Sequence, residues 1–299
     1  MRIAISGSSG LIGSALARTL ESRGDEVVAL VRSRSEADGS TALWNVDEGL
    51  LEREPLQGAD AVVHLAGAGI ADRRWTKERK RLLYSSRVDG TRHLVASLAS
   101  LEHSPRRFLC ASAVGFYGDR GDEKLDEGSD AGDGFLADLS RAWENEARAA
   151  EEFAERVYQL RTGIVLSTEG GALAKMLTPF KLGLGGVIGS GRQFMSWISL
   201  ADEVGAILHL LDTEMVSGPV DLTGPAPVTN REFTKTLGAA LGRPTLFPLP
   251  ALVVKLVFGQ MGEEALLASQ RALPKRLESD GYAFRHRDLG SALTDVLGD

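Results

Sequence analysis

The chain begins with a short apolar strand that leads directly into a glycine-rich turn and a helix-forming segment. Ile3 to Ile5 predicts a buried strand, and glycines follow at positions 7, 10 and 13. In such a turn the first glycine permits the tight bend, the second lets the backbone approach a pyrophosphate, and the third allows close helix packing. The helix N-terminus adds amide donors and a positive dipole. This pattern predicts dinucleotide binding, with a glycine turn that binds nothing as the alternative. The expected contact residues are Gly7, Ser9, Gly10, Leu11, Ile12 and Gly13.

Apolar segments of strand length recur along the first half of the chain and alternate with amphipathic segments of helical length. They are Arg2 to Ile5, Glu26 to Val31, Ala61 to Leu65, Arg107 to Ala111 and Val157 to Leu160. These segments lack an alternating polar face, which is typical of parallel strands covered on both sides by helices. We therefore expect an α/β fold built on a doubly wound parallel sheet.

The second half of the chain is less regular. Glycines crowd residues 183–191, and the segment from Thr229 has a helical pattern that prolines at 244, 248 and 250 interrupt. The helical pattern resumes from Leu266 to Leu277. We predict a nucleotide-binding domain over residues 1–225, with substrate-side loops inserted at 166–195, and a small, mainly helical domain over 226–299. The acidic, glycine-rich stretch Asp119 to Gly134 is expected to bury little and to form a mobile loop, either solvated or acting as a lid.

The end of the second predicted strand indicates which dinucleotide binds. A protein specific for NAD usually places a carboxylate there to hold the ribose 2′-hydroxyl. This chain has Arg32 and Arg34 instead. A guanidinium suits a 2′-phosphate, so these residues favour NADP. The alternative is that both are exposed loop arginines.

Composition excludes several classes of protein. The 34 Lys and Arg residues against 41 Asp and Glu give a net charge of −7, which argues against a nucleic-acid partner. The only cysteine, Cys110, leaves no intramolecular disulfide and no cysteine zinc cluster, and no other cluster suggests a metal. The apolar stretch Pro250 to Gly259 contains Lys255 and is too short to span a membrane. We expect a cytoplasmic protein with no membrane partner, and the sequence leaves its oligomeric state open.

Several further motifs carry a family resemblance. They are His64-Leu65-Ala66-Gly67, Val88-Asp89-Gly90-Thr91, Ser112 to Gly118 and Trp197 to Asp202. With the glycine turn, they make the chain resemble the extended short-chain dehydrogenase/reductase superfamily of NAD(P)-dependent sugar-nucleotide epimerases and dehydratases. Arg74-Trp75-Thr76 and Leu273 to Leu277 resemble its atypical "epimerase family protein" branch, which has a small extra C-terminal domain. The resemblance implies a Rossmann fold and cofactor contacts at Leu65, Ala66 and Gly67.

The chain departs from that superfamily at its proton-transfer pair. The superfamily uses Tyr-x-x-x-Lys, in which the lysine lowers the pKa of the tyrosine. The residues four positions after the tyrosines of this chain are Val88, Gly121, Thr162 and His286. The helix predicted after the acidic stretch has leucine or aspartate where that tyrosine would fall, and it has no lysine. Arg87 also stands where the superfamily motif has asparagine.

Two residues are candidates for the remaining chemistry. Counting back four residues from Tyr117 gives Ala113, but a one-residue loop insertion would give Ser112 the role of the superfamily's serine, and we favour Ser112. Tyr117 is the first candidate for proton exchange, with a packing role as the alternative and a pKa expected near 10. His64 is expected to be a satisfied core histidine.

Charge on the segment Arg73 to Arg92 suggests the type of substrate. This segment has eight basic residues against two acidic ones, so it could face an anionic small molecule or form a solvated helix face. Two functions therefore remain open. One is an NADP-dependent oxidoreductase or epimerase for an anionic, nucleotide-sugar-like substrate. The other is a redox-silent NADP(H)-binding sensor or scaffold.

Overall fold

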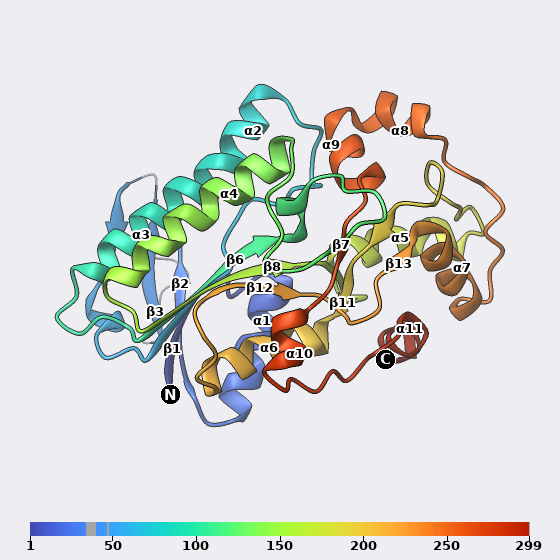
Figure 1. Ribbon diagram of the computed structural model, residues 1–299. Coiled ribbons are helices and arrows are strands. Elements are labelled where there is room, and N and C mark those ends of the chain that lie inside the picture. Colours follow the sequence, from blue (N-terminus) through green and yellow to red (C-terminus); the bar gives the residue numbers. More distant parts are fainter. Residues whose placement is uncertain (34–39, 47, 299) are drawn as a thin grey trace. The chain divides into compact units, whose positions relative to one another are not determined.

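The computed structural model describes residues 1–33, 40–46 and 48–298, and its strands and helices alternate through most of the chain (Figure 1). The strands are β1 (Arg2–Ser6), β2 (Glu26–Val31), β3 (Thr41–Asn45), β4 (Leu50–Leu51), β5 (Ala61–His64), β6 (Arg107–Ala113), β7 (Lys124–Leu125), β8 (Arg156–Thr162), β9 (Ile164–Leu166), β10 (Phe194–Met195), β11 (Trp197–Ser199), β12 (Gly218–Leu222), β13 (Val228–Thr229) and β14 (Arg271–Ala272). The helices are α1 (Leu11–Ser22), α2 (Lys77–Tyr84), α3 (Gly90–Ala99), α4 (Phe135–Arg148), α5 (Gly171–Lys181), α6 (Leu200–Asp212), α7 (Asn230–Ala240), α8 (Ala251–Phe258), α9 (Gln260–Gly262), α10 (Lys275–Ser279) and α11 (Leu289–Gly298).

The chain divides into two compact units, each made of several segments. The first contains residues 1–112, 141–160 and 210–219, and the second contains residues 113–140, 161–209 and 220–299. These units follow contacts in space, whereas the expected domains followed sequence order. The division at residue 225 therefore stays a prediction.

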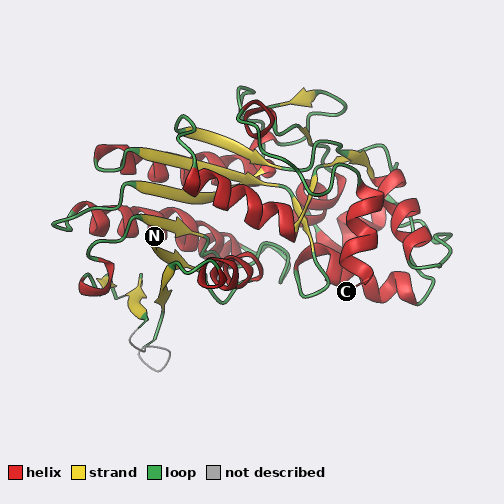
Figure 2. Ribbon diagram, turned by 90° about the horizontal axis from the view of Figure 1, so that it is seen from below, coloured by secondary structure: helices red, strands yellow, loops and turns green. Residues whose placement is uncertain are grey.

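An eight-stranded sheet dominates the fold, in the order β12-β8-β6-β5-β1-β2-β3-β4. β1 pairs in parallel with β2 on one side and β5 on the other, and β5 pairs in parallel with β6. Within the first unit, α1 lies on one face of the sheet and α3 on the other, and Figure 2 shows the strands side by side between helices. The doubly wound α/β fold expected from the sequence is confirmed. Its consequence is that the turns after β1 and β5 leave the same edge of the sheet.

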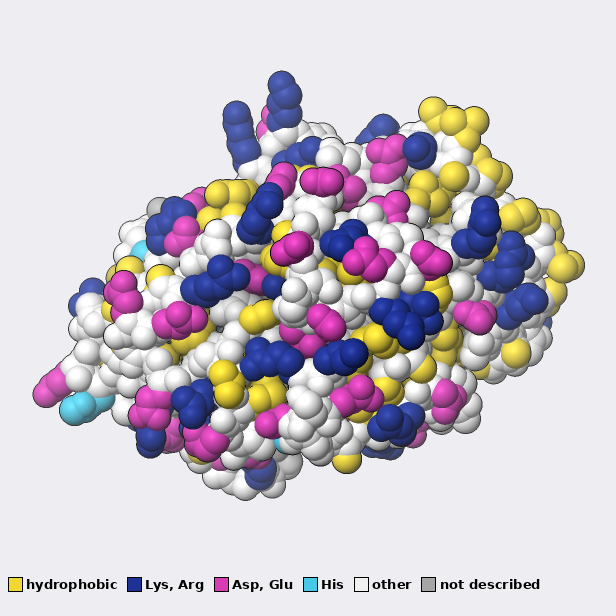
Figure 3. Space-filling model, viewed as in Figure 1, with side chains coloured by type: hydrophobic (Ala, Val, Ile, Leu, Met, Phe, Trp, Pro, Cys, Tyr) yellow, Lys and Arg dark blue, Asp and Glu magenta, His cyan; other side chains and the backbone are white. Residues whose placement is uncertain are grey.

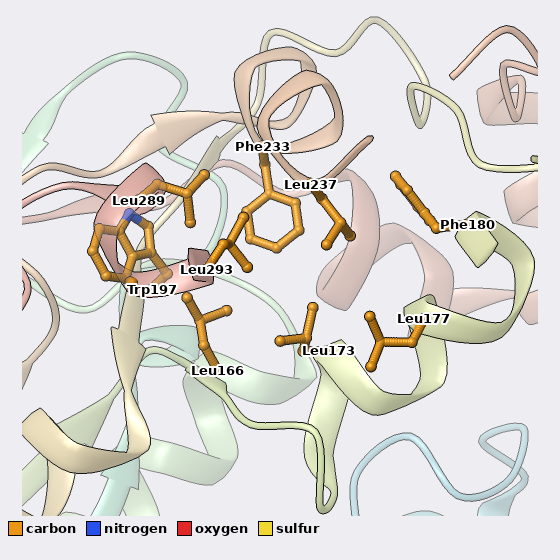
Figure 4. Close-up of a cluster of buried hydrophobic side chains, with 10 residues drawn as sticks. Leu166, Leu173, Leu177, Phe180, Trp197, Phe233, Leu237, Leu289 and Leu293 are labelled. Atoms are coloured by element: carbon orange, nitrogen blue, oxygen red, sulfur yellow. The ribbon is translucent and has the colours of Figure 1, made fainter. Parts of the chain in front are cut away.

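The second unit has its own hydrophobic core. Trp197 on β11 and Phe233 on α7 lie in a cluster with leucines from β9, α5 and α11 (Figure 4). The helix α7 begins with a capping box, in which Thr229 and Glu232 satisfy each other's backbone amides. This explains why the helical pattern starts at Thr229 in the sequence.

One sequence prediction in the second unit is wrong, and another holds only in part. The stretch Leu266 to Leu277 is not one helix, because it contains β14, which pairs with β7. The stretch Asp119 to Gly134 buries little, as expected, but β7 lies within it and Leu125 is 0% exposed. Its mobility stays a prediction. In both cases a strand pairing between segments far apart in sequence overrides the local pattern.

The helix α8 exposes apolar side chains. Leu252 is 68% and Leu256 is 67% exposed, and yellow side chains gather over this helix in Figure 3. Among the residues that the structure describes, no helix is both long enough and apolar enough to cross a bilayer.

Candidate functional site

The turn between β1 and α1 leaves no room for a side chain at its first and third glycines. Gly7 has a φ of +72°, in the left-handed region, and a Cβ there would lie 3.0 Å from the backbone nitrogen of Ala66. The amide of Gly10 donates to the carbonyl oxygen of Gly7 at 2.9 Å. A Cβ on Gly13 would lie 2.2 Å from that same oxygen. The roles predicted for the first and third glycines, a tight turn and close packing, therefore match the geometry.

The first turn of α1 has room and hydrogen-bond donors for an anion. Gly10 is the N-cap residue, and within the described part of the chain no side chain caps this helix. Ser9 and Gly10 are exposed, whereas Leu11 and Ile12 are partly buried. Open amide donors and the positive end of the helix dipole together favour a phosphate at this point. The residues present thus fit the pyrophosphate of a dinucleotide.

The loop after β5 packs against this turn, and buried polar groups form hydrogen bonds with its backbone. The Oγ of Ser6 accepts hydrogen bonds from the amides of Leu65 at 3.1 Å and Ala66 at 3.2 Å. It also lies 2.5 Å from Nδ1 of His64, whose Nε2 lies 3.0 Å from the hydroxyl of Thr91. Because Ser6 already accepts two bonds, its own proton goes to Nδ1, and Nε2 is the protonated nitrogen of the ring. Burial lowers the pKa of His64 to about 3, so His64 is the neutral core histidine that we expected.

Only one of the two arginines predicted to contact a 2′-phosphate can be placed. Arg32 follows β2 directly and is exposed. Arg34 lies outside the described residues. Since β2 neighbours β1 in the sheet, Arg32 leaves the same edge as the glycine turn.

Ser112 lies near the end of β6 and bonds to a carboxylate that the sequence analysis missed. Its hydroxyl donates to Oε1 of Glu144 on α4 at 2.7 Å. Ser112 is 5% and Glu144 is 1% exposed. The helical spacing of the sequence could have indicated Glu144, because it places Glu144 on the same helix face as Ser140 and Ala147, which are buried. In this pair the hydroxyl proton of Ser112 points to the carboxylate of Glu144.

Tyr117 is fully buried, and its hydroxyl is occupied by protein groups. It lies 2.8 Å from Oδ1 of Asp221, 3.0 Å from the carbonyl oxygen of Asp126, and accepts from Nη1 of Arg161 at 3.0 Å. Burial, followed by the negative charge of Asp221, raises the pKa of Tyr117. The expectation of a value near 10 is therefore wrong. The geometry favours the packing alternative for this residue, because Tyr117 is 0% exposed and its hydroxyl has partners within the protein.

The helix position at which the superfamily tyrosine would fall lies at a cavity of the second unit. Leu136 lines this cavity, which has a volume of about 210 Å³. Glu264 caps the start of α4 there, because its carboxylate accepts from the amides of Phe135 and Leu136. The lining residues are Gly115, Gly118, Asp119, Asp133, Leu136, Glu263, Glu264, Ala268 and Gln270. Four carboxylates and no lysine or arginine are among these residues, so the cavity itself is acidic.

The basic segment Arg73 to Arg92 proves mixed. Arg73, Arg74, Lys77 and Arg81 are exposed, and blue side chains project around α2 in Figure 3. Arg92 is exposed and pairs with Asp89 and Glu146. Arg87, in contrast, is buried. Most of the segment is thus a solvated face, and Arg87 is the exception. In the described ranges no group of three or more His, Cys, Asp or Glu residues is placed to hold a metal ion.

Comparison with known proteins covers the whole chain. Residues 3–220 match the model of the NAD dependent epimerase/dehydratase family, and residues 249–296 match a domain of unknown function, DUF1731. An epimerase family protein of Mycobacterium bovis is 46% identical over 291 residues, which is 97% of this chain and 96% of that protein.

Two solved structures are similar in fold and sequence. The crystal structure of human epimerase family protein SDR39U1 (isoform 2) with NADPH has a TM-score of 0.90 and 35% identity, with 100% of both chains covered. A nucleoside-diphosphate sugar epimerase of Corynebacterium glutamicum has a TM-score of 0.82 and 35% identity, covering 100% of this chain and 58% of that one.

Proposed function

This chain belongs to the NAD dependent epimerase/dehydratase family, and on that premise we propose that it is an NADP-dependent oxidoreductase or epimerase acting on an anionic small molecule. The observation that carries the proposal is the turn from Gly7 to Gly13, where glycines make room and the amides of α1 lack a side-chain cap. Bound there, NADP supplies the hydride chemistry.

Two observations support NADP over NAD. Arg32 stands exposed where a protein specific for NAD usually has a carboxylate. The human relative was crystallised with NADPH. The proposed contact residues are those of the glycine turn, Arg32 and Arg34, and the loop Leu65 to Gly67.

Ser112 is the residue that we assign to the reacting oxygen. Because its proton points to Glu144, its Oγ has a lone pair free to accept the O–H of a substrate hydroxyl. When the substrate carbon that carries this hydroxyl gives its hydride to NADP, the hydroxyl proton passes to Ser112. At the same time the proton of Ser112 passes to Glu144. In the reverse direction the same two groups return the proton to a carbonyl oxygen. Ser112 is then the catalytic residue, and Glu144 positions it and holds the proton.

This assignment replaces Tyr117 as the acid/base. A side chain that is 0% exposed and bonded to Asp221 and Arg161 has no path to a substrate without opening its network. We assign to Tyr117 a structural role in the second unit.

The proposed substrate class is an anionic compound of the nucleotide-sugar type. The related C. glutamicum protein is described as a nucleoside-diphosphate sugar epimerase. Two cations of the basic segment lie close to the chain after β5, because Arg87 lies against Gly67 and Arg79 donates to the carbonyl oxygen of Gly69, and such cations suit a diphosphate or a carboxylate.

The burial of Tyr117 and the missing Tyr-x-x-x-Lys pair also favour a second candidate function. In that case the protein binds NADP and NADPH without turnover and acts as a sensor or scaffold. Fold alone does not distinguish the two functions, because one fold serves many.

Deuterium transfer distinguishes them. Purified protein is incubated with NADPH carrying deuterium at the nicotinamide C4, one C4 epimer at a time, together with a small-molecule cell extract, and the label is followed by mass spectrometry. We expect stereospecific loss of label from the cofactor and its appearance in one metabolite. Ser112→Ala and Glu144→Gln should abolish the transfer and keep NADPH binding, whereas Tyr117→Phe should retain it. Full retention of the label from both epimers by protein that demonstrably binds NADPH would favour the sensor.

A further inference from the structure

Arg87 combines burial, positive charge and the absence of an acidic partner. It lies in the π-helical turn Ser85–Asp89 that joins α2 to α3, and it is 8% exposed. Its Nη1 donates to the carbonyl oxygen of Leu83 at a long 3.4 Å, and its guanidinium lies 5.1 Å from the ring centre of Trp143. Across the described residues, Arg87 forms no ion pair with a carboxylate and no other side-chain hydrogen bond.

This state is unusual for a buried guanidinium. It carries five N–H donors, and burial of a charge is costly unless the charge is paired. Neighbouring arginines illustrate the usual solution, since Arg92 pairs with Asp89 and Glu146, and Arg79 pairs with Asp72. Burial, and secondly the charge of Arg79, lower the pKa of Arg87 to about 10. Arg87 is therefore still a cation at neutral pH.

The guanidinium faces the loop that touches the nucleotide turn. A Cβ on Gly67 would lie 3.1 Å from Cζ and 3.2 Å from Nη2 of Arg87. Gly67 is exposed, so this contact is at the surface of the first unit. The other end of the loop meets Gly7, since a Cβ there would lie 3.0 Å from the nitrogen of Ala66. Arg87 thus belongs to the same edge of the sheet as the glycine turn.

We propose that Arg87 is an oxyanion-binding residue, whose guanidinium donates to a phosphate or carboxylate oxygen of a ligand that lies against Leu65 to Gly67. The planar fork of donors matches either oxyanion. Glycine at position 67 leaves space for the guanidinium, since a Cβ there would crowd it. This inference rests on the proposed function, and the oxyanion has two possible sources, which are the pyrophosphate of the cofactor and an anionic group of the substrate.

Binding measurements on two variants test the proposal. Dissociation constants for NADPH and NADH are measured by calorimetry for the unmutated protein, for Arg87→Gln and for Arg92→Gln. Inorganic phosphate is titrated into the same proteins, free and saturated with NADPH. Arg92→Gln is the matched control, because Arg92 is an exposed arginine of the same segment that already has carboxylate partners.

Each source gives its own result. If the cofactor supplies the oxyanion, Arg87→Gln weakens NADPH and NADH equally, by about tenfold or more, and phosphate binds only to the free protein. If the substrate supplies it, NADPH affinity is unchanged, and phosphate binds to the NADPH-saturated protein but not to Arg87→Gln. In both cases Arg92→Gln behaves as the unmutated protein.

Thermal unfolding without ligand separates binding from a purely structural role. A buried cation without an acidic partner adds no stability, so Arg87→Gln should keep or raise the melting temperature while losing the stabilisation that the anion provides. A variant with unchanged affinity for NADPH, NADH and phosphate would overturn the proposal. Failure of the unmutated protein to bind NADPH would instead contradict the proposed function, and the phosphate titration would still decide the role of Arg87.

Discussion

Two regions of this molecule use their hydrogen-bond donors and acceptors in opposite ways. The turn after β1 has glycines that leave room and a helix start without a side-chain cap. The region around Tyr117 has a tyrosine hydroxyl surrounded by Asp221, Arg161 and a backbone carbonyl. The first arrangement leaves donors for a ligand, whereas the second uses its donors within the protein. The comparison indicates that a residue of a family-like motif, such as Tyr117 in Ser112 to Gly118, can have its hydrogen bonds satisfied within the protein.

The same contrast applies to Ser112 and Tyr117, which lie five positions apart. The hydroxyl of Ser112 donates to Glu144 and can still accept a further hydrogen bond. The hydroxyl of Tyr117 already donates and accepts. This difference is the reason why we propose Ser112, and not Tyr117, as the residue that contacts the reacting oxygen.

The largest effect on cofactor binding is expected at the third glycine of the turn. In Gly13→Ala the new Cβ would lie 2.2 Å from the carbonyl oxygen of Gly7, so α1 must move away from the turn. We expect NADPH affinity to fall by well over tenfold and the free energy of unfolding to fall by about 1–3 kcal/mol. Calorimetry and urea unfolding measure the two quantities. Gly290→Ala on α11 is the control, since its Cβ meets only the carboxylate of Asp288, and wild-type binding by Gly13→Ala would refute the role of the turn.

A large loss of stability is expected from opening the network around Tyr117. Asp221→Ala removes a carboxylate that is 0% exposed and lies 2.8 Å from the hydroxyl of Tyr117, and it leaves the buried Arg161 without that charge nearby. Removing one partner of such a buried pair costs about 3–5 kcal/mol. Urea unfolding should show this loss while NADPH affinity stays constant. Tyr117→Phe should cost about 1–3 kcal/mol. A Tyr117→Phe protein of full stability that had lost hydride transfer would restore the tyrosine as the acid/base.

Glu203 on α6, also in the second unit, differs from Tyr117 because one of its buried polar atoms lacks a hydrogen-bond partner among the described residues. Its Oε1 accepts from the hydroxyl of Thr162 at 2.9 Å, but Oε2 has no partner among the described residues. Burial raises its pKa to about 8 from 4.5. The folded state thus binds a proton that the unfolded state releases, and stability decreases as pH rises from 4.5 to 8.

Glu203→Gln should remove this pH dependence, because glutamine is uncharged and its amide oxygen can still accept from Thr162. We expect the two proteins to have similar unfolding free energies at pH 5. Above pH 8 the variant should be more stable by up to about 1.4 kcal/mol for each unit of the pKa shift. Urea unfolding at pH 5, 7 and 8.5 gives the difference, and parallel pH profiles would show that the carboxylate is ionised throughout.

The parts of the fold that could be predicted from the sequence are those decided by residues close to one another in the chain. The strand Glu26 to Val31 and the turn from Gly7 to Gly13 are visible as an apolar run and a glycine spacing. The helix after the acidic stretch follows from its amphipathic pattern. In each case residues close in sequence decide the structure.

The parts that could not be predicted depend on residues far apart in the chain. The stretch Leu266 to Leu277 has a helical pattern, but Arg271 pairs with Lys124 in a strand ladder. Likewise, no local signal connects Tyr117 with Asp221. Glu144 could be placed on a buried helix face, but its bond to Ser112 requires the sheet to bring β6 and α4 together. Contacts at such separations are set by the tertiary fold and not by local pattern.

The smallest effect is expected from Arg32→Ala. This variant tests which arginine contacts the 2′-phosphate of the dinucleotide. Arg32 is exposed, so a bond to the 2′-phosphate is worth close to the lower limit for charged hydrogen bonds. Arg32→Ala should therefore reduce the preference for NADPH over NADH by about tenfold and leave NADH affinity unchanged. Arg53→Ala, at another exposed arginine of the first unit, is the control. Arg87→Gln should not alter this preference, because the pyrophosphate is common to both cofactors. Equal affinities for NADPH and NADH in the unmutated protein would contradict the assignment of Arg32, and a changed preference in Arg87→Gln would mean that the buried arginine contacts the 2′-phosphate instead.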